Sequence, residues 1–130
     1  MKVHSLVVTV LVTVLASPPS QAQSGPEVTG LFSNMGIGSS TGDVGGVELY
    51  ITWGRDSFCG LFQMAEGVPD VPVFVKLEVQ DSTIRFSFPA DSRYAAGLQT
   101  FEGTVSRGGL RGRFANGYAV NLRRLKCGTR

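Results

Sequence analysis

The residues best suited to chemistry in this sequence are one histidine, two cysteines and ten acidic side chains. His4 lies in an N-terminal segment that we expect to be removed, so the remaining chain has no imidazole. It therefore lacks a Ser-His-Asp or Cys-His site and any zinc site that uses histidine. Cys59 and Cys127 form an even pair, which in an exported chain predicts a disulfide. These residues predict a protein that is not an enzyme and holds no metal or cofactor.

Two further patterns allow a catalytic or phosphate-binding interpretation. Paired carboxylates can hydrolyse glycosides, but most of the acids, like Glu48, fall on polar strand faces or in turns. Residues 36–43 are rich in glycine and serine but lack the Gly-Lys-Ser/Thr of a phosphate-binding loop, and Asp43 alone does not make a calcium loop. We interpret this segment as a hairpin loop.

Arg111, Arg113 and Arg123 are candidates for binding an anion. Seven basic residues and no acid follow Glu102, and period-two alternation places these three arginines outward on neighbouring strands. Arginines so placed can bind carboxylates, phosphates or sulfated sugars through bidentate hydrogen bonds. The commoner explanation, which we adopt, is a solvated face whose arginines pair with acids such as Glu102. Nucleic acid is not an expected partner, because aromatic residues are not interleaved with the arginines.

Trp53 and Tyr50 are candidates for contact with a small ligand. Trp53 is the single tryptophan and stands beside Gly54, at the end of a predicted strand that also carries Tyr50. An exposed indole at a barrel mouth can stack on a sugar ring or cap a ligand. A ring that closes the end of the core is the interpretation we adopt.

The N-terminal segment is predicted to direct export. Residues 5–16 form an apolar run that is too short to span a bilayer but fits the core of a secretory signal peptide. Residues 17–22 supply helix-ending prolines and small residues, which predict cleavage after Ala22. We therefore expect a signal peptide over 1–22 and a single soluble domain over 23–130, secreted or periplasmic, whose only membrane contact precedes cleavage.

Apolar and polar residues alternate over most of the remaining chain, which predicts strands rather than helices. Turn sequences such as Asn116-Gly117 separate the segments. The predicted strands are 28–35, 47–53, 57–66, 71–79, 83–88, 100–106, 110–115 and 118–125. About eight short antiparallel strands joined mainly by tight turns favour an all-β meander barrel, with a β-sandwich as the alternative.

Glycine and phenylalanine recur two residues apart on predicted strands. A glycine lets a strand bend sharply, and a neighbouring ring can cover the gap that it leaves. The repeat therefore predicts barrel curvature rather than a ligand motif. It occurs at Gly30-Leu31-Phe32, Gly60-Leu61-Phe62 and Gly112-Arg113-Phe114.

The first of these, combined with an arginine in the last strand, resembles the calycin barrels, the lipocalins and avidins. In that family Gly-x-Trp and a late arginine pack together at the closed end of the barrel. Here Gly30, Phe32 and either Arg123 or Arg124 hold those places. The resemblance implies an interior that can hold one small ligand.

Two functions of different classes remain open. The first is a binding protein that holds an unknown small molecule in the barrel or at its mouth, which a cavity lined by Leu49, Ile51, Phe86 and Phe114 would support. The second is a protein-interaction module, such as an inhibitor of a secreted enzyme, that binds a secreted or cell-envelope protein through loop 36–44 or 89–98. A filled interior would support the second.

The two cysteines constrain the arrangement of the predicted strands. Cys59 is expected to face outward from the third strand, whereas Cys127 follows the eighth. These strands are not neighbours in a simple meander. Either the C-terminal tail crosses over the barrel to reach Cys59, or the strand order differs.

Overall fold

The protein is all-β, as predicted. A computed structural model describes residues 27–126, and within this range the chain forms ten strands and no helix. The predicted signal peptide lies outside the described residues. The strands are β1 (Gly30–Ser33), β2 (Gly36–Ile37), β3 (Val44–Trp53), β4 (Phe58–Pro69), β5 (Val73–Lys76), β6 (Glu78–Gln80), β7 (Thr83–Ser87), β8 (Thr100–Val105), β9 (Gly109–Phe114) and β10 (Ala119–Leu125).

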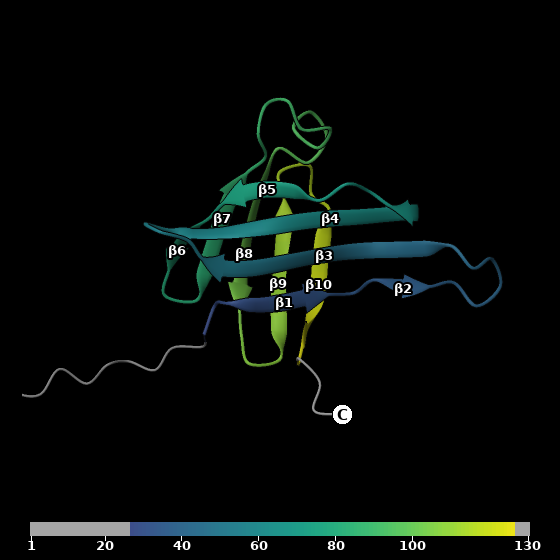
Figure 1. Cartoon of the computed structure of the whole chain (residues 1–130), viewed down its shortest axis with the longest axis horizontal. Coiled ribbons are helices and arrows are strands. Elements are labelled where there is room, and N and C mark those ends of the chain that lie inside the picture. Colours follow the sequence, from purple (N-terminus) through teal and green to yellow (C-terminus); the bar gives the residue numbers. More distant parts are fainter. Residues whose placement is uncertain (1–26, 127–130) are drawn as a thin grey trace, which may run out of the picture.

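The strands form a nearly closed antiparallel barrel in meander order. The sheet runs β5-β4-β3-β1-β10-β9-β8-β7-β6, and β2 pairs with β3 beside this path. The first strand, β1, pairs with both β3 and β10, which joins the two ends of the meander. Figure 1 shows β1, β3, β4 and β5 crossing in front of the strands of the opposite wall. The β-sandwich alternative is not the fold found.

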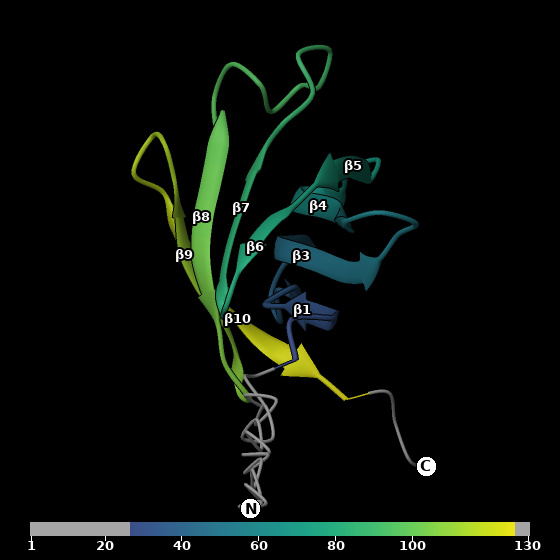
Figure 2. The ribbon, with the colours of Figure 1, turned by 90° about the vertical axis from the view of Figure 1, so that its left-hand side faces the viewer.

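The structure refines the predicted strands at two places. Residues 36–37 form a short strand that pairs with the start of β3, so the glycine-rich segment is the hairpin that the sequence predicted. The predicted strand 71–79 is divided at Leu77, whose N–H donates to the Phe58 carbonyl at 3.0 Å. Residues before Leu77 pair with β4, whereas those after it pair with β7. One continuous segment thus belongs to two edges of the sheet, which Figure 2 shows diverging from each other.

Aromatic rings fill much of the barrel interior. Phe62 lies centrally, with ring centroids of four other aromatic residues 4.9–6.2 Å away. Most of these contacts are edge-to-face, which is a favoured geometry for aromatic pairs. The four partners of Phe62 are Phe86, Phe88, Tyr94 and Phe114.

Glycines permit close packing where the sequence pattern suggested curvature. At Gly112 in β9, an added Cβ would lie 2.3 Å from the Phe101 ring, which comes from the neighbouring strand β8. The ring therefore occupies the space above the glycine, as predicted for a curved sheet. Replacing Gly112 would displace a buried aromatic side chain.

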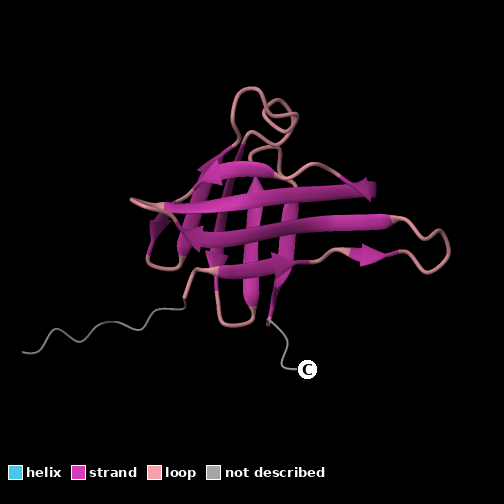
Figure 3. Cartoon of the chain, in the orientation of Figure 1, coloured by secondary structure: helices cyan, strands magenta, loops and turns pink. Residues whose placement is uncertain are grey.

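A loop connects β7 to β8 and covers one end of the barrel. Figure 3 shows residues 88–99 as the loop that rises beyond these two strands. Two of its side chains, Tyr94 and Leu98, are buried in the core. None of the described residues lies in a helix suited to spanning a membrane.

Candidate binding surfaces

The side chains of the described residues fill the barrel interior that they enclose. The space among the side chains that line it amounts to about 10 Å³. This is about the volume that one water molecule requires, and a small organic ligand needs several hundred cubic ångströms. The aromatic core therefore leaves no ligand-sized cavity between Leu49, Phe86 and Phe114, three of the residues predicted to line one.

The loop over the barrel end, residues 88–99, is bonded to the β4–β5 connection through two of its side chains. The Tyr94 hydroxyl donates a hydrogen bond to the Asp70 carboxylate at 2.8 Å, and Arg93 forms an ion pair with the same group. Burial, followed by the hydrogen bond and the negative charge of Asp70, raises the pKa of Tyr94 to about 12. Tyr94 is therefore a neutral hydrogen-bond donor at physiological pH. The loop predicted to carry binding residues closes the barrel instead of projecting from it.

Trp53 and Tyr50 do not form one site. Trp53 is 58% exposed at the end of β3, where its ring makes an edge-to-face contact with Phe58. Our interpretation that Trp53 closes the core was wrong, because its ring is mostly exposed and packs on Phe58, which itself lies at the edge of the core. Tyr50 points outward from the barrel wall and is also exposed.

An apolar row crosses the outer wall. Register pairs Leu125 with Leu31, Leu31 with Tyr50, Tyr50 with Leu61, and Leu61 with Phe74. The row spans β10, β1, β3, β4 and β5, and its outermost member, Phe74, is 52% exposed. Directly opposed side chains of neighbouring strands lie in contact distance, so the five form one continuous surface feature.

Two of the three candidate arginines line one groove. Arg111 and Arg123 face outward from the paired strands β9 and β10 and both line a groove of about 480 Å³. Arg111 donates a hydrogen bond to the Asn121 side chain, whereas Arg113 lies outside the groove and donates to the Gly117 carbonyl.

The expected acidic partner of these arginines is engaged elsewhere. Glu102 forms its ion pair with Arg85 of β7 at 2.8 Å. Among the described residues no salt bridge involves Arg111, Arg113 or Arg123. The arginine groove is thus cationic and polar, with charge that is not neutralised by a described acid.

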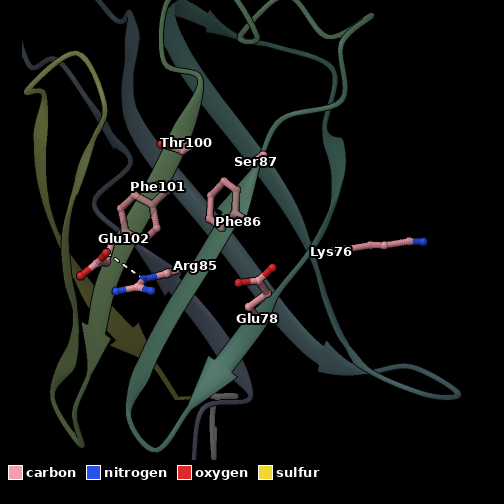
Figure 4. Close-up of a pocket in the computed structure, with 8 residues that line it drawn as sticks. All are labelled: Lys76, Glu78, Arg85, Phe86, Ser87, Thr100, Phe101 and Glu102. Atoms are coloured by element: carbon pink, nitrogen blue, oxygen red, sulfur yellow. Dashed lines mark hydrogen bonds and ion pairs between the residues drawn. The ribbon is translucent and has the colours of Figure 1, made fainter.

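A second groove lies where the barrel does not close. It measures about 510 Å³ and is lined by Lys76 of β5 and by residues of the hydrogen-bonded strands β6, β7 and β8. Figure 4 shows the Arg85–Glu102 ion pair on one side, and Lys76 extending from the strand on the other. The backbone at Ser87 lies between them. We call this groove the seam.

The described residues give no sign of a metal centre. No group of three histidine, cysteine, aspartate or glutamate side chains lies close enough to hold an ion in the part of the chain that the structure describes. Cys59 is the one cysteine in this range, and it carries a free thiol there. Cys127 lies outside the described residues, so the predicted bridge stays a prediction.

Comparison of the chain with protein-family models, curated proteins and solved structures gives no match. The fold and surfaces define a small, nearly closed antiparallel barrel with a filled aromatic interior. Of the two arginines expected beside Phe32, the one that packs on its ring is Arg124.

Sequence reasoning missed the apolar row and the seam. The row has a sequence signal, because Val73-Phe74-Val75 breaks the apolar–polar alternation and forces an apolar side chain outward. The seam has none. It depends on the division of one predicted strand between two sheet edges.

Proposed function

We propose that this protein is a non-enzymatic binding protein that acts through the outer wall of its barrel on another polypeptide. The observation that carries the proposal is the apolar row from Leu125 to Phe74, which crosses five neighbouring strands and in which every member except the half-buried Leu31 is exposed. Contiguous exposed apolar surface is characteristic of protein-interaction sites. The filled interior adds support, because it leaves no room for a ligand inside the barrel and only the outer surface is available for binding.

The sequence supports the absence of catalysis. The only histidine precedes the predicted cleavage site, and the single cysteine in the described range is the predicted partner of Cys127. Export to the periplasm or beyond is part of the proposal, and its partner is then a secreted or cell-envelope protein. Intact-mass measurement of the exported protein should give a chain that begins at Gln23.

A small ligand at the barrel mouth is the second candidate, favoured by the buried aromatic cluster. Such a ligand would have to displace Tyr94 and Leu98, which occupy the end of the core. Its affinity would then rise in Asp70→Asn, which weakens the attachment of the loop. Titration of wild type and Asp70→Asn with a hydrophobic fluorescent probe tests this candidate.

Native mass spectrometry of the protein isolated from its own host tests the proposed function. We expect a complex whose added mass is that of a polypeptide, and whose components separate under denaturing conditions. Leu61→Ser, which places a hydroxyl in the middle of the apolar row, should lower the fraction of complex. Glu48→Gln, on the outer face of the neighbouring strand β3 and outside the apolar row, is the matched control. A retained molecule of a few hundred daltons, with no protein partner, would overturn the proposal.

A further inference from the structure

Two rows of outward side chains on three neighbouring strands build the arginine groove. Register places Thr104 of β8 opposite Arg111 of β9, and Arg111 opposite Asn121 of β10. Arg123 lies in the next outward row of β10, opposite Gly109. All five residues line the same groove of about 480 Å³. This volume falls in the range of small-molecule sites.

A glycine keeps the middle of the groove open. Gly109 is buried, and an added Cβ there would lie 2.1 Å from the Leu122 carbonyl oxygen, so a glycine is required. On its other side, the Ser106 N–H donates to the Gly109 carbonyl at 2.7 Å. Gly109 therefore has no side chain to cover the space between Ser106 and Arg123, and Arg123 is exposed beside it.

The groove holds hydrogen-bond donors that its own residues do not use up. Arg111 donates one hydrogen bond, from Nε to the Asn121 Oδ1 at 3.3 Å. A guanidinium has five N–H groups, and the side-chain nitrogen of Asn121 has two. The bond uses the Asn121 oxygen, so that nitrogen is left as a donor. It also directs the Arg111 guanidinium toward β10, the strand that carries Arg123.

The positive charge of the groove is not neutralised by the acids on nearby strands. Glu102 is bound to Arg85 at 2.8 Å. Glu48 belongs to the same row as Arg123 but lies two strands away, a separation of about 10 Å. Neither arginine of the groove forms a salt bridge with a described residue. A solvated face that pairs with neighbouring acids therefore does not describe this part of the surface.

We propose that the arginine groove binds a sulfated saccharide. Arg111 and Arg123 donate to the sulfate oxygens, because the planar fork of a guanidinium matches a tetrahedral oxyanion. Asn121, Thr104 and Ser106 bond to the sugar hydroxyls, since amide and hydroxyl groups can both donate and accept. This site goes beyond the proposed function, because it needs no residue of the apolar row.

The lining of the groove favours a saccharide over other anionic ligands. Among the described residues no aromatic side chain lines it, so it offers no surface for stacking a nucleobase. Strand β9 is hydrogen-bonded to β8 on one side and to β10 on the other, which leaves an acidic peptide no free strand edge at the centre. The buried Leu122 is the single large apolar residue in the lining, so apolar peptide side chains have no pocket.

Nuclear magnetic resonance of the arginine side chains tests the proposal. The probe is a trisulfated heparin disaccharide, added to the full exported chain. We expect the Nε–H signals of Arg111 and Arg123 to shift with one binding constant, while those of Arg55 and Arg113, outside the groove, stay in place. The desulfated disaccharide should bind weaker by about tenfold or more. Equal affinity for the two disaccharides, or equal shifts at all four arginines, would overturn the proposal.

Lysine substitutions separate recognition by the arginine fork from attraction by charge alone. Arg111→Lys combined with Arg123→Lys keeps both charges but replaces each fork with a point charge, so affinity should fall by about tenfold. The matched control is Arg55→Lys combined with Arg113→Lys, because Arg113 shares the outer face of β9 but lies outside the groove. This control should bind as wild type does. Unchanged affinity in the first double variant would contradict the proposed site.

Two further measurements separate this inference from the alternatives. A blocked oligoglutamate peptide with the charge of the disaccharide offers carboxylates without sugar hydroxyls, and we expect it to bind more weakly. If it binds the groove as tightly, the ligand is an acidic polypeptide and the saccharide proposal is wrong. Leu61→Ser should lower the fraction of polypeptide complex and leave disaccharide binding unchanged, so the proposed function and the saccharide site can each fail without the other.

Discussion

The guanidinium of Arg124 lies over the ring of Phe32, with its Cζ 4.6 Å from the ring centroid. The same guanidinium donates hydrogen bonds to the carbonyls of Glu27, Thr29 and Ser106. It therefore ties the residues before β1 to the β8–β9 turn across the end of β10. Gly30 has a φ of +137°, and an added Cβ there would come within 2.8 Å of the guanidinium, so a glycine is required.

Arg124→Ala should lower the free energy of unfolding by about 3 kcal/mol, because it removes three charge-assisted hydrogen bonds and a cation–π contact. Arg123→Ala is the matched control, since its side chain is exposed on the outer face, and it should change stability by less than about 0.5 kcal/mol. Urea unfolding measures both. Equal effects of the two substitutions would contradict the structural role of Arg124.

Much of the barrel follows from the sequence. Strict alternation in β3, where Val47, Leu49 and Ile51 are buried, predicts both the strand and its inward face. The resemblance carried by Gly30 and Phe32 also implied that an arginine of the last strand packs beside them. Alternation alone does not choose between Arg123 and Arg124, because that choice depends on the register of β10 against β1.

The surfaces were less predictable than the core. The period-two pattern continues through Leu77, so it does not reveal that one segment changes partners there. Loop 89–98 looks polar enough to project, yet burial of Tyr94 and its bond to Asp70 fold it over the barrel end. Such contacts join residues far apart in the chain, and local patterns do not encode them.

The Tyr94 hydroxyl predicts a stability change at high pH. Its pKa is raised to about 12, above the ordinary value of 10.0. A raised pKa means that protonated Tyr94 stabilises the fold fully below pH 10, and that this contribution is lost as the pH rises through 12. Tyr94→Phe should cost about 1 kcal/mol at pH 8 and show a smaller decline between pH 10 and about 12. Denaturant unfolding across this range measures the difference.

Tyr118→Phe is the matched control for that experiment. Tyr118 is exposed and its ring stacks on Phe114, so removing its hydroxyl should change the stability little across the same pH range. A pH dependence that is the same in wild type and Tyr94→Phe would show that other groups cause the alkaline decline.

The arginine groove predicts binding of sulfated sugars. Arg111→Ala combined with Arg123→Ala should weaken affinity for a heparin hexasaccharide by about tenfold or more, because each arginine can donate charge-assisted hydrogen bonds. The charge-matched control is Arg55→Ala combined with Lys76→Ala, as neither residue lines this groove. Calorimetric titration measures affinity. Equal losses in the two double variants would indicate a net-charge effect only.

The predicted disulfide is in tension with the strand register. Leu125, Leu31, Tyr50 and Leu61 lie in one row, so two strands separate β10 from β4. Three strand spacings amount to about 14 Å, whereas the Cα atoms of a disulfide lie about 4.4–6.8 Å apart. Cys127 is only two residues beyond Leu125, and each residue spans at most about 3.8 Å.

We therefore expect the Cys59–Cys127 bridge to form at the expense of the Leu125 pairing with β1, which leaves the apolar row in place from Leu31 to Phe74. Peptide mapping without reductant should show the bridge within one chain, and the amides of Leu31 and Leu125 should exchange faster in the oxidised protein than in Cys59→Ser. Closing so long a loop should still stabilise the chain, by up to about 4 kcal/mol in the chain-entropy description. A covalent dimer, or two thiols that both react in the exported protein, would contradict an intramolecular bridge.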